Sequence, residues 1–248
     1  MPELKIINLC AGVDNKVILR GINLEIGNGK TILLMGPNGS GKSTLAQVLI
    51  GNPKYKILSG KILFNNIDIT DLPLEKRVKM GISASFQIPP KLRGIKLREL
   101  AMAILRKKGE KNPDEKIYRL VKEMKLEEFL DREINVGFSG GEMKRAELFL
   151  VLLQNPTFVI LDEIDSGVDV ESVGILGKVI RNELQRDGRS LIIISHTGII
   201  AKHVRIDIAY IMLNGKITCY GPPTIVLNHV LEHGFARCKK CEGICYVD

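Results

Sequence analysis

The chain has 248 residues, of which 45% are hydrophobic and 26% are charged, so disordered and collagen-like proteins are excluded. No apolar run approaches the roughly 20 residues that a membrane-spanning helix needs, and the N-terminus lacks the apolar stretch of a signal peptide. We therefore expect a cytoplasmic protein with no direct insertion into a membrane. The net charge of +8 fits a lysine-rich surface or a partner with phosphates. The aromatic content of 5%, with no Trp, argues against nucleic acid as a partner.

Short β-rich runs alternate with helix-period stretches, which predicts an α/β fold with a substantial parallel sheet. The expected strands of the first part lie at residues 4–9, 16–26, 31–36 and 60–65. The GNGK segment between the second and third of these strands is a turn signal, so we expect antiparallel pairing in part of this region. Charged residues at spacings of three and four predict surface helices over 91–135.

After Pro156 the strand pattern returns, and we expect strands at 157–163, 190–196 and 208–221 with a helix at 170–186. The run FVIL in the first of these strands is apolar at every position, which is typical of a strand buried on both faces of a parallel sheet. The simplest layout is a single domain over residues 1–248. It has a core at 1–88 and 154–225, an inserted helical subdomain at 89–153, and a cysteine-containing tail at 226–248.

The strongest motif is a phosphate-binding loop that follows the predicted strand TILLM and precedes a helix-period run. Its residues fit G-x-x-x-x-G-K-[ST] and are Gly36, Pro37, Asn38, Gly39, Ser40, Gly41, Lys42, Ser43 and Thr44. Glycines let successive backbone N–H groups approach phosphate oxygens, and the following helix adds the positive end of its dipole. We expect Lys42 to reach the β- and γ-phosphates of a nucleotide and Ser43 to ligate Mg²⁺.

Two carboxylates, Asp162 and Glu163, end the apolar strand at 157–163. The C-terminal ends of buried strands face the crevice where α/β proteins bind ligands. Asp162 is expected to hold Mg²⁺, directly or through water, and Glu163 to orient and deprotonate an attacking water. Alone, such a pair is usually a solvated strand end; together with the phosphate loop it favours catalysis.

The run Phe138-Ser139-Gly140-Gly141-Glu142 opens a helix-period segment. Ser139 and Glu142 form an S-x-x-E capping box, which is a purely structural explanation of the run. A helix start with two glycines and a serine also exposes N–H groups and a hydroxyl to an anion. Because one phosphate loop already serves a nucleotide, a second anion site suggests contact with the nucleotide of another molecule.

From residue 4 to about 225, the chain resembles the ATP-binding cassette (ABC) ATPases. Gln87 matches the Q-loop glutamine, 138–142 the signature motif, 160–163 the Walker B end and 165–169 the D-loop, while His196 matches the switch histidine. The resemblance implies a nucleotide-binding domain with a P-loop core, an antiparallel β subdomain and an inserted helical subdomain.

The same resemblance implies a function and a partner. Two copies would form a homodimer around two ATP molecules, with Ser139, Gly140 and Gly141 of each copy on the ATP of the other. Catalysis would involve Glu163, His196 at the γ-phosphate, and Gln87 as the sensor of Mg²⁺ and water. The implied cofactors are ATP and Mg²⁺, with Mg²⁺ held by Ser43, Gln87 and Asp162.

Within the family, the strings GFSGGEMKRAE and DEIDSGVD resemble the Suf-system ATPases, which act with a soluble scaffold that assembles iron–sulfur clusters. Two residues depart from that pattern: Met143 stands where a basic residue is typical, and Val168 where Leu is typical. Val13 stands where the family stacks an aromatic side chain on adenine, so only the resemblance favours ATP over GTP.

Three other functions share parts of this sequence pattern. The alternative is an ATP-binding subunit of a membrane ABC transporter, which shares the chemistry and differs in its partner. A DNA-repair or chromosome ATPase is disfavoured because the stretch between Thr44 and Phe138 has no room for a long coiled coil. A non-catalytic binding module is disfavoured because every catalytic position is filled.

The tail contains Cys238, Cys241 and Cys245 in a C-x₂-C-x₃-C pattern. This spacing could supply three of the four ligands of zinc or of an iron–sulfur cluster, with the fourth from His233, Cys219, a partner chain or an exogenous ligand. The alternative is a chain end whose cysteines are incidental. The odd total of five cysteines, without a secretory signal, argues against a disulfide framework.

Overall fold

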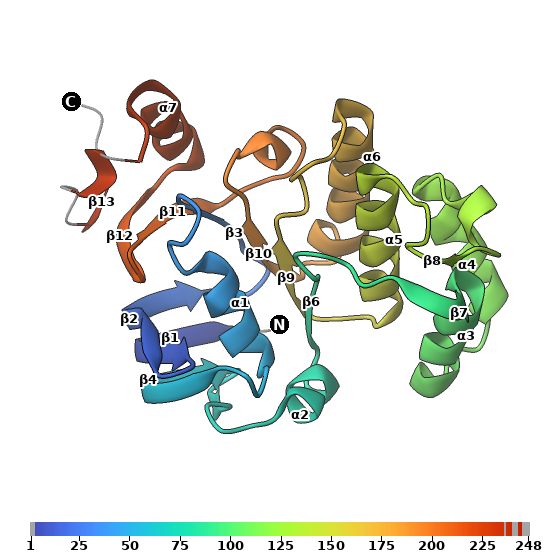
Figure 1. Cartoon of the computed structure of the whole chain (residues 1–248), viewed down its shortest axis with the longest axis horizontal. Coiled ribbons are helices and arrows are strands. Elements are labelled where there is room, and N and C mark those ends of the chain that lie inside the picture. Colours follow the sequence, from blue (N-terminus) through green and yellow to red (C-terminus); the bar gives the residue numbers. More distant parts are fainter. Residues whose placement is uncertain (1–2, 236, 240–242, 245–248) are drawn as a thin grey trace.

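The computed structural model describes residues 3–235, 237–239 and 243–244. Two sheets make up its centre, with strand orders β2-β1-β4-β5 and β13-β12-β11-β3-β10-β9-β6. Figure 1 shows the four-stranded sheet at one end of the long axis and helices α3 to α6 at the other. The predicted α/β architecture, with a largely parallel sheet and an antiparallel one, is confirmed. Among the described residues, no helix is long and apolar enough to span a bilayer.

The four-stranded sheet is antiparallel. Its strands are β1 (Leu4–Val13), β2 (Lys16–Ile26), β4 (Lys56–Phe64) and β5 (Ile67–Asp68). β1 pairs antiparallel with both β2 and β4, so the predicted antiparallel pairing is confirmed. The tight turn that produces it is Asp14-Asn15, where both residues have positive φ, as a two-residue hairpin requires. The GNGK turn has a different role, because it takes the chain from β2 into β3 of the other sheet.

The seven-stranded sheet contains the parallel strands that the apolar runs predicted. Its strands are β3 (Thr31–Met35), β6 (Ile82–Ala84), β9 (Phe158–Asp162), β10 (Ser190–Ile194), β11 (Ile208–Leu213), β12 (Lys216–Gly221) and β13 (Gly243–Ile244). β10 pairs in parallel with β3 and β9, and β9 pairs in parallel with β6. Every residue of β3, β9 and β10 is buried, because helices and the other sheet cover both faces. The C-terminal ends of β3, β10, β9 and β6 therefore lie side by side at one edge.

Helices surround this sheet. They are α1 (Lys42–Ile50), α2 (Leu74–Lys79), α3 (Leu97–Lys108), α4 (Pro113–Glu123), α5 (Gly140–Leu153), α6 (Val170–Ile180) and α7 (Pro223–His233). The helix predicted at 170–186 consists of α6 and a π-helical extension, η2 (Arg181–Gln185). In the stretch predicted as surface helices, α3 and α4 form, but the short strands β7 (Leu92–Lys96) and β8 (Glu133–Ile134) also pair antiparallel. Their mostly exposed, charged residues gave no period-2 signal.

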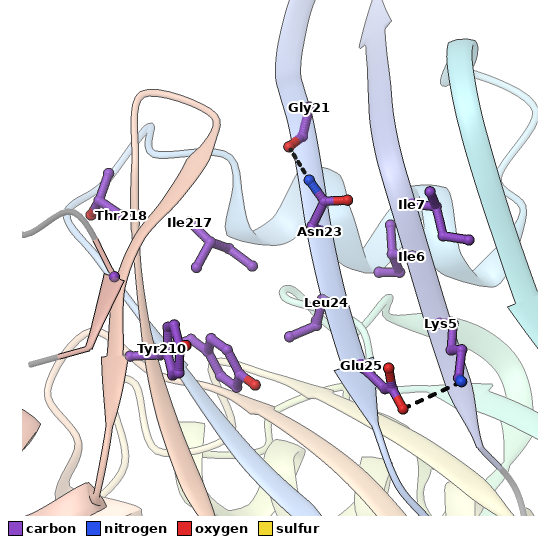
Figure 2. Close-up of a pocket in the computed structure, with 12 residues that line it drawn as sticks. Lys5, Ile6, Ile7, Gly21, Asn23, Leu24, Glu25, Tyr210, Ile217 and Thr218 are labelled. Carbon is purple, nitrogen blue, oxygen red and sulfur yellow. Dashed lines mark hydrogen bonds and ion pairs between the residues drawn. The ribbon is translucent and has the colours of Figure 1, made fainter.

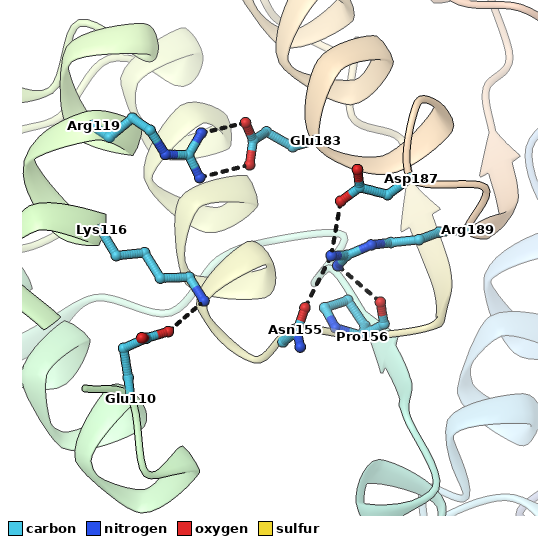
Figure 3. Close-up of polar contacts among 8 residues, drawn as sticks. All are labelled: Glu110, Lys116, Arg119, Asn155, Pro156, Glu183, Asp187 and Arg189. Atoms are coloured by element: carbon cyan, nitrogen blue, oxygen red, sulfur yellow. Dashed lines mark hydrogen bonds and ion pairs between the residues drawn. The ribbon is translucent and has the colours of Figure 1, made fainter. Parts of the chain in front are cut away.

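Ion pairs connect the α3–α4 region to the helix that follows β9. The guanidinium of Arg119 on α4 is bidentate to Glu183 in η2 (Figure 3), and Lys125 Nζ lies 2.7 Å from Glu171 on α6. These side chains are partly or largely exposed, so each pair contributes about 1 kcal/mol or less. Both helical regions also contribute to one hydrophobic cluster, with Leu120 of α4 and Leu176 of α6 among its buried residues.

A groove of about 600 Å³ opens where β2 and the β11–β12 hairpin diverge. Figure 2 shows Tyr210 on one side and the Lys5–Glu25 ion pair on the other. Tyr210 and Tyr220 stack with ring centroids 5.6 Å apart. None of the predicted site residues is among the described residues that line this groove.

Arg77 on α2 holds the end of the helix that starts at the phosphate loop. Its side chain is 2% exposed and donates to the carbonyls of Val48 and Leu49 at 2.8 and 2.9 Å. It also donates to Leu72 O and Thr70 O at 2.8 and 2.9 Å. The last carbonyls of a helix have no partner inside the helix, so this guanidinium satisfies the C-terminal end of α1. Nothing in the sequence pattern distinguished Arg77 from a surface arginine.

We expect Arg77→Met to lower the free energy of unfolding by about 3 kcal/mol, because four buried or partly buried carbonyls lose the guanidinium as a donor. Chemical denaturation measures this change. Lys76→Met on the exposed face of the same helix is the matched control and should change stability by less than about 0.5 kcal/mol. Equal stabilities of the two variants would contradict the structural role of Arg77.

Candidate active site

The loop between β3 and α1 is shaped by glycine and held together by lysine. A Cβ on Gly36 would lie 2.2 Å from the carbonyl oxygen of Met212, so only glycine permits this path. Lys42 is 4% exposed, and its Nζ donates to Gly36 O at 2.9 Å and Pro37 O at 3.0 Å. Burial lowers the pKa of Lys42, while the nearby carboxylates of Glu163 and Asp162 oppose that shift. The ammonium is therefore held inside the loop.

Asp162 and Ser43 form a pair of oxygen ligands beneath this loop. Ser43 Oγ donates to Asp162 Oδ1 at 3.3 Å, and Oδ2 of the fully buried Asp162 has no hydrogen-bond partner. Burial raises the pKa of Asp162 to about 6, against the hydrogen bond from Ser43. An unpaired, buried carboxylate oxygen beside a hydroxyl is a donor set that suits Mg²⁺. The residues present thus fit the predicted cation.

A pocket of about 650 Å³ brings together residues from five separate segments. Its lining consists of Ile18, Asn38, Gly39, Gly41, Lys42, Ser43, Thr44, Gln87, Glu163, Ser166 and His196. Four of the segments meet because they follow β3, β6, β9 and β10, whose C-terminal ends are neighbours in the sheet; the fifth is Ile18 on β2. The predicted residues Gly36, Pro37, Ser40 and Asp162 are not in the lining. All four contact Lys42 or Ser43 from behind the lining: Gly36, Pro37 and Ser40 accept from Lys42, and Asp162 accepts from Ser43.

Glu163 adopts a backbone conformation that is uncommon for its residue type. Its φ is +51°, and its N–H donates to the carbonyl of Ile194 at 2.9 Å. Non-glycine residues with positive φ cluster at functional sites, where the surrounding structure offsets a cost of about 1–3 kcal/mol. Here the turn directs the carboxylate after β9 into the same pocket as Lys42.

The loop that carries His196 is fixed by Asp165. The Oδ2 atom of Asp165 accepts hydrogen bonds from Ser195 Oγ at 2.8 Å, Thr197 Oγ1 at 3.0 Å and Ile200 N at 3.1 Å. His196 therefore lies between two anchored residues, and its buried Nδ1 has no partner. The predicted D-loop, 165–169, thus begins with a residue that connects the loops after β9 and β10.

The signature residues lie outside this pocket. Ser139 is the N-cap of α5: its Oγ accepts from Glu142 N at 3.3 Å, and its N–H donates to Glu142 Oε2 at 2.7 Å. The predicted capping box is therefore confirmed. A Cβ on Gly141 would lie 2.4 Å from Ser172 Oγ, so the first turns of α5 and α6 are in close contact. Ser139, Gly140 and Gly141 are not among the described residues that line the pocket.

Sequence reasoning missed Ile18 and named Ser166 only as part of the D-loop. Ile18 lies on β2, where an apolar side chain gave no signal of a binding role. Val13, the position expected near the base, lines a different cavity together with Lys16, Lys54 and Lys56. In this chain the apolar contact beside the phosphate loop therefore comes from β2 itself.

The predicted metal site in the tail falls largely outside the described residues. Cys241 and Cys245 lie outside them, whereas Cys238 is buried in η4 (Arg237–Lys239) and Cys219 is buried in β12. Within 3–235, 237–239 and 243–244, no group of three or more His, Cys, Asp or Glu side chains could hold a metal ion. The tail site stays a prediction.

The fold and the pocket define a P-loop nucleotide-binding protein, and comparisons with known proteins specify its family. A family model described as "ABC transporter" matches residues 19–166. A probable ABC transporter ATP-binding protein of Streptococcus pyogenes is 34% identical over 99% of this chain and 98% of its own length. A solved ATP-binding cassette of an ABC transporter is 28% identical, with a TM-score of 0.79 over 94% of this chain and 96% of its own.

A second relative has a different description. The iron-sulfur cluster assembly protein SufC of Plasmodium falciparum is 39% identical over 96% of this chain and 71% of its own length. The probable ATP-dependent transporter ycf16 of Cyanophora paradoxa is 38% identical over 86% of both chains. The chain therefore belongs to the ABC transporter ATP-binding family. It is an ATPase, and its substrate is ATP bound with Mg²⁺.

Proposed function

We propose that this ATPase drives iron–sulfur cluster assembly on a soluble scaffold. The observation that carries the proposal is the likeness to SufC over 96% of the chain, supported by the strings GFSGGEMKRAE and DEIDSGVD. The two departures from the Suf pattern, Met143 and Val168, are partly buried and pack against the hydrophobic cluster. Neither lines the nucleotide pocket among the described residues, so both are compatible with unchanged chemistry.

In the proposed mechanism, the pocket residues act mainly by positioning and charge stabilisation. Lys42 binds the β- and γ-phosphates from the loop whose carbonyls at Gly36 and Pro37 it contacts. Ser43, Asp162 and Gln87 hold Mg²⁺, which neutralises phosphate charge when it is bound. Glu163 accepts a proton from the attacking water.

Two further residues complete the proposed reaction. His196 contacts the γ-phosphate from the loop that Asp165 fixes. Ser139 contacts the nucleotide that is bound by a second copy of the chain, because it lies outside the nucleotide pocket of its own copy. We therefore include an ATP-dependent homodimer in the proposal, in which the N-terminus of α5 from each copy completes the other pocket.

The alternative function is the ATP-binding subunit of a membrane transporter. The observation that favours it is the match to the S. pyogenes ABC transporter ATP-binding protein, which covers almost the whole of both chains. The two functions share the pocket and differ in the partner of the region at 91–135.

Affinity capture distinguishes the two functions. We expect the tagged chain with Mg–ATP to recover β-rich scaffold subunits from the soluble fraction of its source cells, identified by mass spectrometry. Ile95→Asp, at an exposed apolar position of β7, should reduce recovery about tenfold or more. Leu231→Asp, at an exposed position of α7, is the matched control. Recovery of multi-span permease subunits from detergent extracts, with no soluble scaffold, would favour the transporter function.

A further inference from the structure

The side chains at the centre of the loop that carries Gln87 are exposed and do not hold it. Phe86 is 57% exposed and Ile88 is 84% exposed, and Gln87 between them is also exposed. Before these residues, Ser85 is tied to β9: its N–H donates to Ile160 O, and its Oγ accepts from Asp162 N, both at 2.8 Å. Side-chain packing therefore cannot fix the position of Gln87, and contacts to its backbone must do so.

At Phe86 and Gln87 the backbone contacts come from two side chains of α5, whereas further along the loop Asn135 Nδ2 donates to Pro90 O at 2.8 Å. Lys144 Nζ donates to Phe86 O at 3.2 Å and to Gln87 O at 2.9 Å. The Oε1 atom of Glu147, one helical turn further on, accepts a hydrogen bond from Phe86 N. The N–H and C=O groups of Phe86 are thus both bound by one face of a single helix. The two side chains also lie 3.8 Å apart at their charged ends.

Lys144 and Glu147 are buried, where removing a charged group from water costs free energy. Lys144 and Glu147 side chains are 6% and 5% exposed, and Glu147 Oε2 has no hydrogen-bond partner. Burial raises the pKa of Glu147 to about 7, against the attraction of Lys144. Buried ion pairs often stabilise a fold no better than apolar residues of similar volume. Fold stability alone therefore does not account for the pair.

We propose that Lys144 and Glu147 are positioning residues for Gln87, and that they couple the Q-loop to the helix that begins at the signature serine. Gln87 lines the pocket of its own chain, whereas Ser139 starts α5 outside that pocket. The pair makes the Q-loop backbone and α5 move as one unit. This inference rests on the role proposed above for Gln87. In that role the Gln87 side chain must be positioned to within a fraction of an ångström, so the backbone that carries it must be fixed.

The test replaces the pair by apolar side chains of similar volume. Lys144→Met with Glu147→Met removes the hydrogen bonds to the loop without leaving a single buried charge, so the fold is expected to survive. Hydrogen–deuterium exchange of the amides at 85–88 should rise about tenfold. We expect kcat for ATP to fall about tenfold or more, with ATP affinity within about threefold of wild type because the phosphate loop is untouched.

Two comparisons separate positioning from a structural effect. In a Gln87→Ala background, the same double substitution should lower kcat by no more than about twofold further, because both changes affect one unit. Glu147→Gln alone keeps an acceptor for Phe86 N–H and should retain at least about half of the wild-type kcat. The control is Lys116→Met with Glu110→Met, a solvent-accessible ion pair of the α3–α4 region (Figure 3).

Unchanged exchange at 85–88, or faster exchange with unchanged kcat, would overturn the proposal. Equal losses of kcat with and without Gln87 would also overturn it, because the pair would then act on another group. A Gln87→Ala variant with wild-type kcat would overturn the catalytic role of Gln87 and, with it, the positioning role of the pair. The exchange data would still show whether the pair holds the loop.

Discussion

Lys42→Ala is expected to lower ATP hydrolysis by roughly a thousandfold. No other cation lines the pocket among the described residues, so the charge that develops on the β- and γ-phosphates would lose its nearest positive partner. The substitution also removes the bonds that tie Gly36 O and Pro37 O together. Steady-state phosphate release with Mg–ATP measures the loss.

The matched control for this prediction is Lys54→Ala, at a cavity away from the phosphate loop. It should keep at least about half of the wild-type rate, because surface charges act on the pocket only weakly through solvent. Near-wild-type hydrolysis by a folded Lys42→Ala protein, with its partner present, would overturn the assignment of the phosphate loop.

Glu163→Gln is expected to stop hydrolysis while ATP still binds, so that an ATP-dependent dimer accumulates. The amide cannot take a proton from water, which should reduce kcat by about 10²- to 10⁴-fold. The substitution keeps the size of the side chain, and the phosphate contacts of Lys42 and Ser43 are unaffected. Single-turnover hydrolysis and size-exclusion chromatography with Mg–ATP measure the two effects.

Glu171→Gln on the exposed side of α6 is the control and should hydrolyse ATP at the wild-type rate. If both the Glu163→Gln variant and the wild type elute as monomers with Mg–ATP, the dimer proposal fails. If the Glu163→Gln variant turns over normally, another group activates the water.

The strands and the phosphate loop could be predicted from the sequence because their signals are local. The apolar runs before Gly36 and Asp162 mark strands buried on both faces, and the loop motif specifies its own strand–helix context. β7 and β8 could not be predicted, since their pairing joins two short, polar segments about 40 positions apart. Such strands depend on their tertiary surroundings more than on propensity.

In the candidate site, too, residues in local motifs could be predicted, whereas residues that act through tertiary contacts could not. Motif matching named Gln87, Glu163 and His196, which line one pocket, although their catalytic roles stay predictions. It did not identify Lys144 and Glu147 as contacts of the Q-loop, because a hydrogen bond between a helix side chain and a distant backbone N–H or C=O group has no sequence pattern. Nor did it identify Arg77, whose partners are all backbone atoms.

The order of strands in the larger sheet also governs when the pocket can form during synthesis. β3 is completed at Met35, but its neighbours in the sheet are β10 and β11, which begin at Ser190 and Ile208. A nascent chain therefore carries the apolar run Thr31–Met35 without its strand partners until most of the protein has left the ribosome. Long-range parallel pairing of this kind is slow and leaves apolar strands prone to aggregation. Ribosome-bound chains that end before β10 should need a chaperone and should be unable to retain nucleotide.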